Sequence, residues 1–231
     1  MKRVMIIKTD YLFEDISDRV ALWIPDNNLD NHVLVRYVDA ALENNISKIS
    51  VPVGGAELIW PWVEKNRISL LTRFNFSDFL TDKPDDCISN FASKVSSEFR
   101  HGASGVQVFL SKLNMNTFVQ EITPIRQDLF FDKSFSVGLN IEDFGVYDWG
   151  DVFEKINKIN ANSLLLCATG EKFDAKSDFV GRIFSLLESW DTNADLHIMF
   201  GKNMMRVGQT IRLVKKMRPE LDEKMTVFVE N

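Results

Sequence analysis

The sequence has few of the side chains that bind metals or form disulfides. Its 231 residues include two cysteines and three histidines, namely Cys87, Cys167, His32, His101 and His197. No two of them stand at the spacing of a zinc-ligand pair or of a Cys-x-x-Cys motif, so we expect no metal site and no disulfide. We also predict no cofactor. A nucleophilic role for Cys167 has no base in its sequence neighbourhood, so a reduced packing residue is the simpler interpretation.

Long apolar runs and long basic runs are also missing. The longest apolar stretches, such as Leu164–Ala168, are far shorter than the roughly 20 residues needed to cross a bilayer. The formal net charge is −6 and the basic residues are dispersed, so we expect no nucleic-acid partner. The first residues, Met1–Lys8, are followed by acidic side chains and lack a signal-peptide core. We therefore predict a cytoplasmic protein that contacts neither membrane nor nucleic acid.

What the sequence does have is a regular alternation of short β-rich runs and helical patterns. Its composition, 45% hydrophobic and 26% charged, is that of an ordinary globular protein. Several of the runs are apolar on both faces, which is typical of parallel strands covered on both sides. We predict strands at Val20–Pro25, Lys48–Val53, Ser69–Phe74, Gly105–Ser111, Ser134–Glu142, Ser163–Thr169, Leu196–Gly201 and Met225–Glu230.

Apolar residues at helical spacing separate these strands, as in Val152, Phe153, Ile156 and Ile159. An extra helix is predicted ahead of the first strand, at Tyr11–Arg19. The other predicted helices are Asn31–Asn44, Ala56–Asn66, Pro84–His101, Asn114–Leu129, Asp148–Asn160, Lys176–Trp190 and Asn203–Met217.

Eight strands and seven intervening helices in strict alternation favour a (β/α)₈ TIM barrel, formed by residues 1–231 as a single domain. An open, doubly wound parallel sheet is the alternative, but units of nearly equal length favour closure. The usual final helix is missing because the chain stops at Asn231, so the N-terminal segment or a second subunit would cover that side. Together with the aromatic stretch Leu58–Trp62, this predicts a homo-oligomer.

Three stretches carry a more specific pattern. They are Glu43–Phe76, Phe99–Ser111 with its His-Gly-Ala sequence, and Ile159–Gly170 with its Leu-Leu-Leu-Cys-Ala-Thr-Gly sequence. With the order of the elements, they resemble the class I aldolase superfamily, and most of all the deoxyribose-phosphate aldolase family, over nearly the whole chain. The resemblance implies a TIM barrel and a carbon–carbon lyase, in which a lysine amine forms a Schiff base with a carbonyl substrate.

The positions that carry this chemistry in the family hold other residues here. The Schiff-base lysine aligns with Leu166, and the fourth-strand aspartate aligns with Gln107. A fifth-strand lysine aligns near Gly138. The seventh-strand lysine aligns with Phe200, or with Lys202 if the alignment slips by two residues.

The family's phosphate-binding glycine pair aligns with Met204 and Met205, whose side chains keep backbone amides away from a phosphate. Leucine cannot form an imine, and glutamine cannot take up a proton at neutral pH. We therefore predict a catalytically degenerate aldolase-like barrel, a pseudoenzyme that binds a small carbonyl or phosphorylated metabolite. Two alternatives stay open: an active carbon–carbon lyase with Lys202 as a displaced nucleophile, and a partner-binding or assembly module.

Functional side chains of a TIM barrel lie at the C-terminal ends of its strands and in the loops that follow. Lys202 with Glu142 is the candidate catalytic pair. Arg73 with Arg206 is suited to an anionic group, unless each guanidinium pairs with a carboxylate such as Glu142 or Asp143. The candidate ligand-binding residues are Asp26, Asn28, Arg73, Asn140, Thr169 and Arg206.

Overall fold

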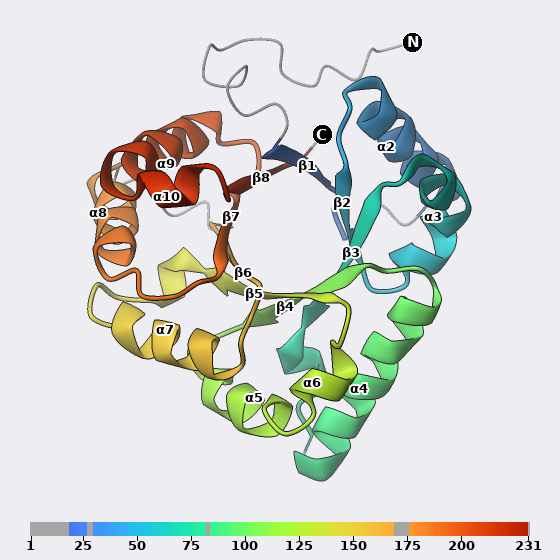
Figure 1. Cartoon of the computed structure of the whole chain (residues 1–231), viewed down its shortest axis with the longest axis horizontal. Helices are drawn as coiled ribbons and strands as arrows, with labels where there is room; N and C mark the ends of the chain where they lie inside the picture. Colours follow the sequence, from blue (N-terminus) through green and yellow to red (C-terminus); the bar gives the residue numbers. More distant parts are fainter. Residues whose placement is uncertain (1–18, 27–29, 82–83, 169–175, 231) are drawn as a thin grey trace.

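A computed structural model of the chain describes residues 19–26, 30–81, 84–168 and 176–230. Its strands form a closed parallel barrel in sequence order, ringed by helices (Figure 1). The predicted closure is confirmed and the open-sheet alternative is wrong, because β1 pairs in parallel with both β2 and β8. The strands are β1 (Val20–Trp23), β2 (Lys48–Pro52), β3 (Ser69–Asn75), β4 (Gly105–Leu110), β5 (Ser134–Asn140), β6 (Ser163–Cys167), β7 (Asp195–Met199) and β8 (Thr226–Glu230).

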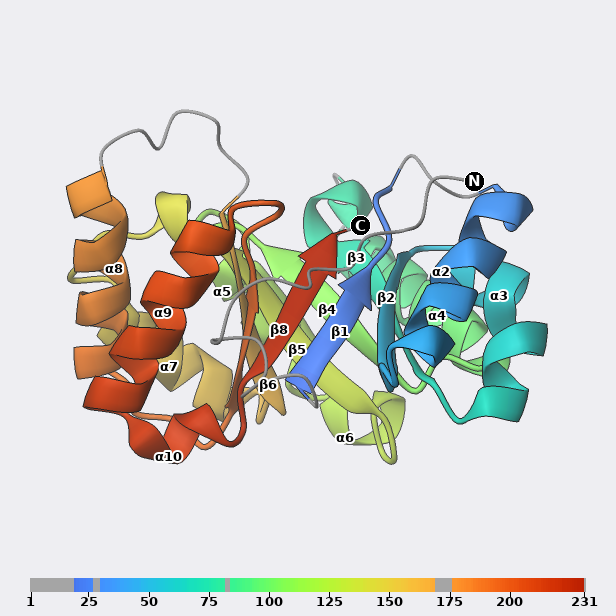
Figure 2. The same ribbon diagram turned by 90° about the horizontal axis from the view of Figure 1, so that it is seen from above.

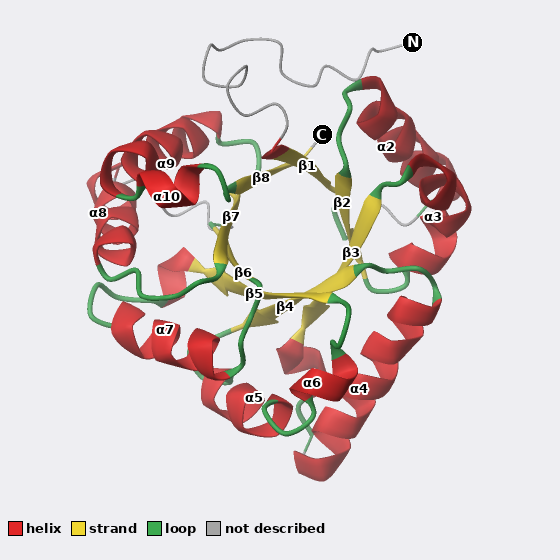
Figure 3. Ribbon diagram, viewed as in Figure 1, coloured by secondary structure: helices red, strands yellow, loops and turns green. Residues whose placement is uncertain are grey.

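Helices connect successive strands on the outside of the barrel (Figure 3). The single helix predicted at Asn114–Leu129 is wrong, since Pro124 has no N–H to donate to the preceding turn and the segment divides into two helices. The α-helices are α2 (Asn31–Glu43), α3 (Gly55–Val63), α4 (Pro84–Arg100), α5 (Met115–Ile122), α6 (Arg126–Leu129), α7 (Trp149–Lys158), α8 (Lys176–Glu188), α9 (Met204–Met217) and α10 (Pro219–Asp222). Short 3-10 helices are η2 (Glu64–Asn66), η3 (Phe76–Phe79) and η4 (Ile141–Asp143).

The two ends of the chain lie partly outside this description. The helix predicted at Tyr11–Arg19 is outside the described residues except for Arg19. None of the described helices lies outside the junction of β8 and β1, between α9 and α2 (Figure 3). In the part of the chain that the structure describes, no helix has the length and hydropathy needed to cross a bilayer.

The barrel has two distinct ends. The arrowheads of β1 and β8 point toward one end in Figure 2, while α6 and α10 lie at the other. We call the end at the carboxyl termini of the strands the mouth. Because parallel strands all end there, the loops that follow them converge on it.

Alternation along each strand divides its side chains between two cores. In β6, Leu164 and Leu166 pack in the large core between strands and helices, whereas Leu165 and Cys167 belong to a smaller cluster inside the barrel. The inner cluster consists of Ala21, Trp23, Leu71, Leu165, Cys167, Met199 and Phe228.

Phenylalanines attach α4 and α5 to the barrel. The ring of Phe91 in α4 meets that of Phe76 edge-on at a centroid distance of 5.9 Å, and Phe118 of α5 lies 4.8 Å from Phe76. Phe130 stacks on Phe135 of β5 at 4.5 Å. Such pairs contribute roughly 0.5–1.5 kcal/mol each beyond their burial, so the elements beneath the loops of β3 and β4 are firmly held.

Gly102, after α4, combines a positive φ of 91° with a close approach, because a Cβ there would lie 2.1 Å from a ring atom of Trp60. We predict that Gly102→Ala lowers the free energy of unfolding by about 2–4 kcal/mol, from overpacking and left-handed strain. The control is Gly181→Ala within α8, where a Cβ meets no atom within 4 Å, and it should stabilise by about 1 kcal/mol. Urea unfolding measures both, and equal effects would contradict the account.

Candidate functional site

Trp23, the last residue of β1, closes the barrel beneath the mouth. Its ring meets Phe109 and Phe228 edge-on, with centroids 6.0 Å away in each case. The guanidinium carbon of Arg73 lies 3.9 Å from the centroid of the Trp23 ring. A cation over an aromatic ring that is shielded from water contributes about 2 kcal/mol. The floor of the mouth is therefore a packed layer of aromatic rings and one guanidinium.

Arg73 is held in this layer by hydrogen bonds. One guanidinium nitrogen donates to the Ser50 hydroxyl at 3.0 Å, and the other donates to Asp26 Oδ1 at 2.7 Å and to the carbonyl oxygen of Ile24. The Arg73 side chain is 5% exposed, whereas that of Asp26 is 82% exposed. Burial lowers the pKa of Arg73, and the nearby Asp26 carboxylate opposes that effect. Of the two roles considered for Arg73, the structure displays pairing with a carboxylate, and the partner is Asp26.

Below this layer, Gln107 faces inward and accepts a hydrogen bond from the Ser50 hydroxyl at 2.5 Å. Gly138 also faces inward, and the ring of Phe109 occupies the space beside it, so that a Cβ would lie 2.8 Å from the ring. The positions aligned with the family's aspartate and fifth-strand lysine thus face the barrel interior. At these positions Gln107 has a side-chain amide and Gly138 has no side chain.

The alignment of the Schiff-base lysine with Leu166 needs a correction. Leu166 faces the helices, so the inward positions of β6 nearest the mouth are Leu165 and Cys167. Phe200 also faces outward, against Phe179 of α8 at a centroid distance of 5.1 Å. Leu166 and Phe200 therefore do not fill the barrel interior. The neighbouring residues that do face inward, Leu165, Cys167 and Met199, also have no amine.

Cys167 lines the cleft and is a candidate nucleophile there. Burial raises its pKa to about 12, although the charge of Arg73 acts in the opposite direction. At neutral pH the thiol therefore stays protonated and is a poor nucleophile. This agrees with the interpretation of Cys167 as a packing residue.

A cleft of about 660 Å³ lies above the floor, within the size range of ligand pockets. Among its lining residues, three carry a negative and one a positive charge at neutral pH, which leaves a formal charge of −2. Within the described residues, no group of three or more His, Cys, Asp or Glu side chains is placed to hold a metal ion. The lining consists of Trp23, Asp26, Pro52, Val53, Arg73, Phe74, Asn75, Ser77, Asp78, Phe109, Leu110, Ser111, Asn140, Asp143, Cys167 and Met199.

Three of the predicted ligand-binding residues meet at this cleft, namely Asp26, Arg73 and Asn140. The Asn140 side chain also accepts a hydrogen bond from the backbone N–H of Glu142 at 3.2 Å, which orients it at the end of β5. Asn28 and Thr169 lie outside the described residues.

The predicted residues of the seventh strand do not join the cleft. Lys202 is exposed on the turn before α9 and is absent from the cleft lining. The Arg206 guanidinium lies over the ring of Phe179, 5.2 Å from its centroid, so Arg73 and Arg206 do not form one anion site. Met204 packs against the helix-side core, and Met205 is half exposed.

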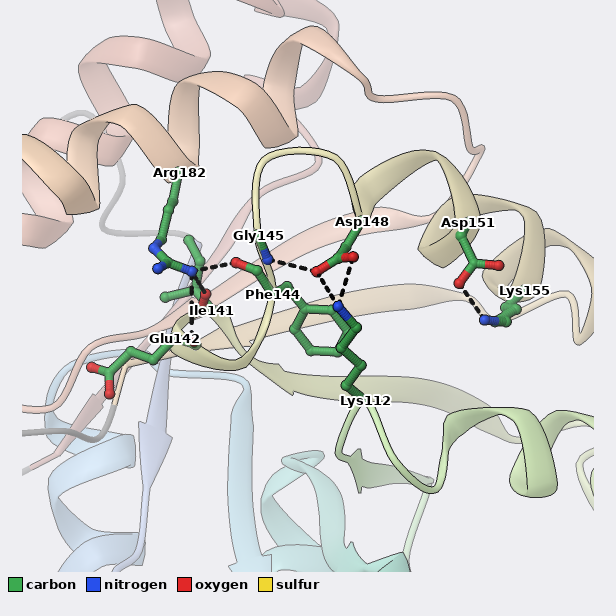
Figure 4. A network of polar contacts seen from close by, with 9 residues as sticks. All are labelled: Lys112, Ile141, Glu142, Phe144, Gly145, Asp148, Asp151, Lys155 and Arg182. Carbon is green, nitrogen blue, oxygen red and sulfur yellow. Dashed lines mark hydrogen bonds and ion pairs between the residues drawn. The ribbon is translucent and has the colours of Figure 1, made fainter.

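Glu142 lies in the loop after β5, which is held by the network in Figure 4. Arg182 of α8 donates to the carbonyl oxygens of Ile141 and Glu142, each at 3.4 Å, and to that of Phe144. The Glu142 side chain points away from Arg182 in Figure 4 and does not line the cleft. The backbone of Glu142 thus helps to hold the rim, and the carboxylate stays outside the cleft.

An ion pair joins this loop to the loop after β4. Lys112 Nζ lies 2.8 Å from the Asp148 carboxylate, which also accepts from the Gly145 N–H at 2.7 Å (Figure 4). Both hydrogen bonds lower the pKa of Asp148. The two loops therefore form a continuous section of the rim.

Sequence reasoning missed the aromatic floor and part of the rim. The sequence predicts Trp23 and Phe109 only as strand residues, although a large aromatic residue near a strand's carboxyl end is a usable signal once its inward direction is known. Ser77 and Asp78 follow β3 on η3, which was not predicted. Asn114 links the rim by donating to the Ser77 hydroxyl at 2.9 Å.

The fold is shared with solved aldolase structures. The chain resembles the deoxyribose-phosphate aldolase of Aeropyrum pernix, described as tetrameric, with a TM-score of 0.68 and 10% identity over 94% of this chain and 86% of the other. It resembles a candidate deoxyribose-phosphate aldolase of Toxoplasma gondii with a TM-score of 0.73 and 12% identity over 95% and 92%. A similar candidate from Coccidioides immitis gives 0.69 and 10% over 96% and 83%.

Comparisons of the sequence alone find no related protein. No protein-family model matches the chain, and no curated protein matches it. The likeness in three dimensions thus establishes the predicted deoxyribose-phosphate aldolase-like TIM barrel. At such low identity, it extends to the fold and not to the chemistry.

His197 is buried inside the barrel, where its ring lies 5.6 Å from that of Phe228. Burial, with a contribution from the charge of Lys48, lowers the pKa of His197 to about 3. An unfolded chain has a histidine pKa of about 6.5. Between these pH values the unfolded state binds a proton that the folded state does not, so the free energy of unfolding falls as the pH falls through this window.

We predict that this contribution reaches up to about 1.4 kcal/mol per pH unit and is lost in His197→Gln. Urea unfolding between pH 7 and pH 4 should therefore show a shallower pH dependence for His197→Gln than for the unmodified chain. His32→Gln, at an exposed position of α2, is the matched control. The same slope for all three proteins would refute a buried, neutral His197.

Proposed function

We propose that this protein binds a small neutral carbonyl or polyhydroxylated metabolite at the barrel mouth and forms no Schiff base with it. The observation that carries the proposal is the identity of the inward side chains around the mouth. On β4 to β7 they include Gln107, Gly138, Cys167 and Met199, none of which has an amine. A barrel with an aldolase fold and this interior is suited to binding and not to imine chemistry.

The charge of the cleft favours a neutral ligand over a phosphorylated one. Asp26, Asp78 and Asp143 line it, and its one described cation, Arg73, is already occupied by Asp26 and by backbone and hydroxyl oxygens. A phosphate dianion would meet net repulsion there. Hydroxyl and carbonyl groups would instead find amide and hydroxyl partners in Asn140 and the serines of the rim.

The lyase alternative with Lys202 receives no support from this geometry. The Lys202 side chain is exposed, and it is not among the residues that line the cleft. A catalytic amine must reach the carbonyl carbon of a bound substrate. With Glu142 also outside the cleft, the candidate catalytic pair does not meet the proposed ligand.

The assembly alternative is supported by apolar side chains on the rim. Leu113 is 93% exposed and Tyr147 is 98% exposed, and they stand on the two loops that the ion pair of Lys112 and Asp148 joins. In contrast, most of the stretch Leu58–Trp62 packs inward, and its Trp62 is 40% exposed. We propose that the chain self-associates through Leu113 and Tyr147, because exposed apolar side chains on two connected loops favour a protein contact.

For the mouth, we expect glyceraldehyde to shift the indole N–H signal of Trp23 reversibly in NMR spectra, since the ring lines the cleft. Borohydride reduction of the same mixture, followed by peptide mass spectrometry, should label Lys202 no faster than other exposed lysines. In the Lys202→Gln variant, the remaining lysines should be labelled at the same rate as in the unmodified chain. Rapid labelling of one lysine to full occupancy would contradict the proposal.

Glyceraldehyde 3-phosphate is the control for ligand charge. It should bind at least about tenfold more weakly than glyceraldehyde, and Asp78→Asn with Asp143→Asn should reduce that difference. Equal or stronger binding of the phosphorylated compound by the unmodified chain would refute the neutral-ligand proposal.

For self-association, we expect sedimentation at micromolar concentration to give a mass above the monomer mass of 26.6 kDa. Leu113→Ser combined with Tyr147→Ser should shift the equilibrium to the monomer. Leu42→Ser with Phe184→Ser, which removes two partly exposed apolar side chains from α2 and α8, is the control and should leave the mass unchanged. A monomer in all cases would count against assembly.

A further inference from the structure

A second hollow lies at the other end of the barrel from the mouth. It has a volume of about 540 Å³ and opens at the starts of β3, β4 and β5. Arg67 lies just before β3, Arg100 at the end of α4, and Lys133 just before β5. Trp60 and Phe99 supply an apolar wall. A concave site with an apolar wall and a few converging polar groups is the usual form of a small-molecule site.

The hollow is positively charged in a chain of negative net charge. Arg67, Arg100 and Lys133 line it with one carboxylate, that of Glu64, which leaves a formal charge of +2. The whole chain has a formal net charge of −6. Cations gathered against the sign of the net charge indicate a preference for an anion at this place.

The three cationic side chains of the hollow make few interactions with other side chains of the described residues. Within the described residues, the guanidinium groups of Arg67 and Arg100 have neither a hydrogen-bond nor an ion-pair partner. Lys133 Nζ lies 3.5 Å from the carboxylate of Asp132, which is 70% exposed, and 5.8 Å from the centroid of the Phe99 ring. Such an exposed pair is weak, so all three groups are available to an incoming anion.

Arg67 also occupies an unusual backbone position. It follows η2 with φ 53°, in the left-handed region, and the other two described non-glycine residues there are Asn45 and Asn160, which follow α2 and α7. Asparagine tolerates this conformation, whereas a long side chain costs about 1–2 kcal/mol. An arginine kept at such a cost, beside two other cations, is consistent with a role for its guanidinium.

The apolar wall depends on a residue that has no side chain. Because Gly102 lacks a Cβ, the ring of Trp60 lies against the backbone at the end of α4. Ser104 also lines the hollow, and its hydroxyl donates to the carbonyl oxygen of Leu70 at 3.0 Å. Flat apolar groups could therefore stack here beside the cations.

We propose that this hollow binds a phosphate group carried on a small organic molecule with a flat apolar body. Guanidinium groups recognise phosphate oxygens through paired N–H donors, and Lys133 adds a third positive charge. The aromatic wall of Trp60 and Phe99 would contact the body of the ligand. The site is independent of the mouth, which carries the opposite charge.

NMR titration of the full chain at low ionic strength tests the proposal with phenyl phosphate and inorganic phosphate. Both should shift the backbone amide signals of Gly102 and Ser104 saturably, and phenyl phosphate should bind several-fold more tightly because of the wall. No saturable shift at these amides at millimolar concentration, or shifts confined to Trp23 and Asn140 at the mouth, would overturn it.

Arg67→Asn separates binding from folding. Asparagine fits the left-handed backbone, so this variant should unfold at the same temperature as the unmodified chain or higher, yet bind phenyl phosphate at least about tenfold more weakly. Arg212→Gln removes one exposed guanidinium from α9 and is the control for net charge, so it should bind normally. Equal affinity of Arg67→Asn and the unmodified chain would overturn the proposal.

Discussion

The parallel pairing of β1 with β8 is the constraint on which the rest of the structure depends. Val20–Trp23 pairs residue by residue with Val227–Glu230, and this contact closes the sheet. Closure removes both edge strands and divides every strand's side chains between the barrel interior and the helix side. Inward side chains near the carboxyl ends of the strands, together with side chains of the loops that follow them, can then reach a ligand at the mouth. The chemistry available to the protein follows from that short list.

The barrel interior near the mouth holds closely packed side chains and lacks a reactive amine among the described residues. Trp23 contacts two phenylalanine rings, and the guanidinium of Arg73 lies over its ring. Cys167, which also faces inward, is buried and protonated. Charge is distributed along the barrel axis, negative at the mouth and positive at the hollow beside Arg67. The two hollows thus carry opposite formal charges, −2 at the mouth and +2 beside Arg67.

The periodicity of the sequence was sufficient to predict all eight strands, with ends within two residues. It does not predict which residues of Leu164–Cys167 face inward, because a run that is apolar throughout has no alternation to read. Leu166 therefore aligns with the lysine although it faces the helices, and its neighbours Leu165 and Cys167 face inward. The pair of Arg73 with Asp26 joins residues 47 apart, and local patterns carry no information on such contacts. Pro124, in contrast, was a local signal for the divided helix.

The central claim is that the mouth holds a small neutral ligand without a covalent bond to the chain. A crystal structure of the protein soaked in glyceraldehyde tests it most directly. The account predicts separate ligand density above Trp23, within hydrogen-bond distance of Asn140, and every described lysine free of additional density. Continuous density from a lysine Nζ to a ligand carbon in the mouth would contradict it.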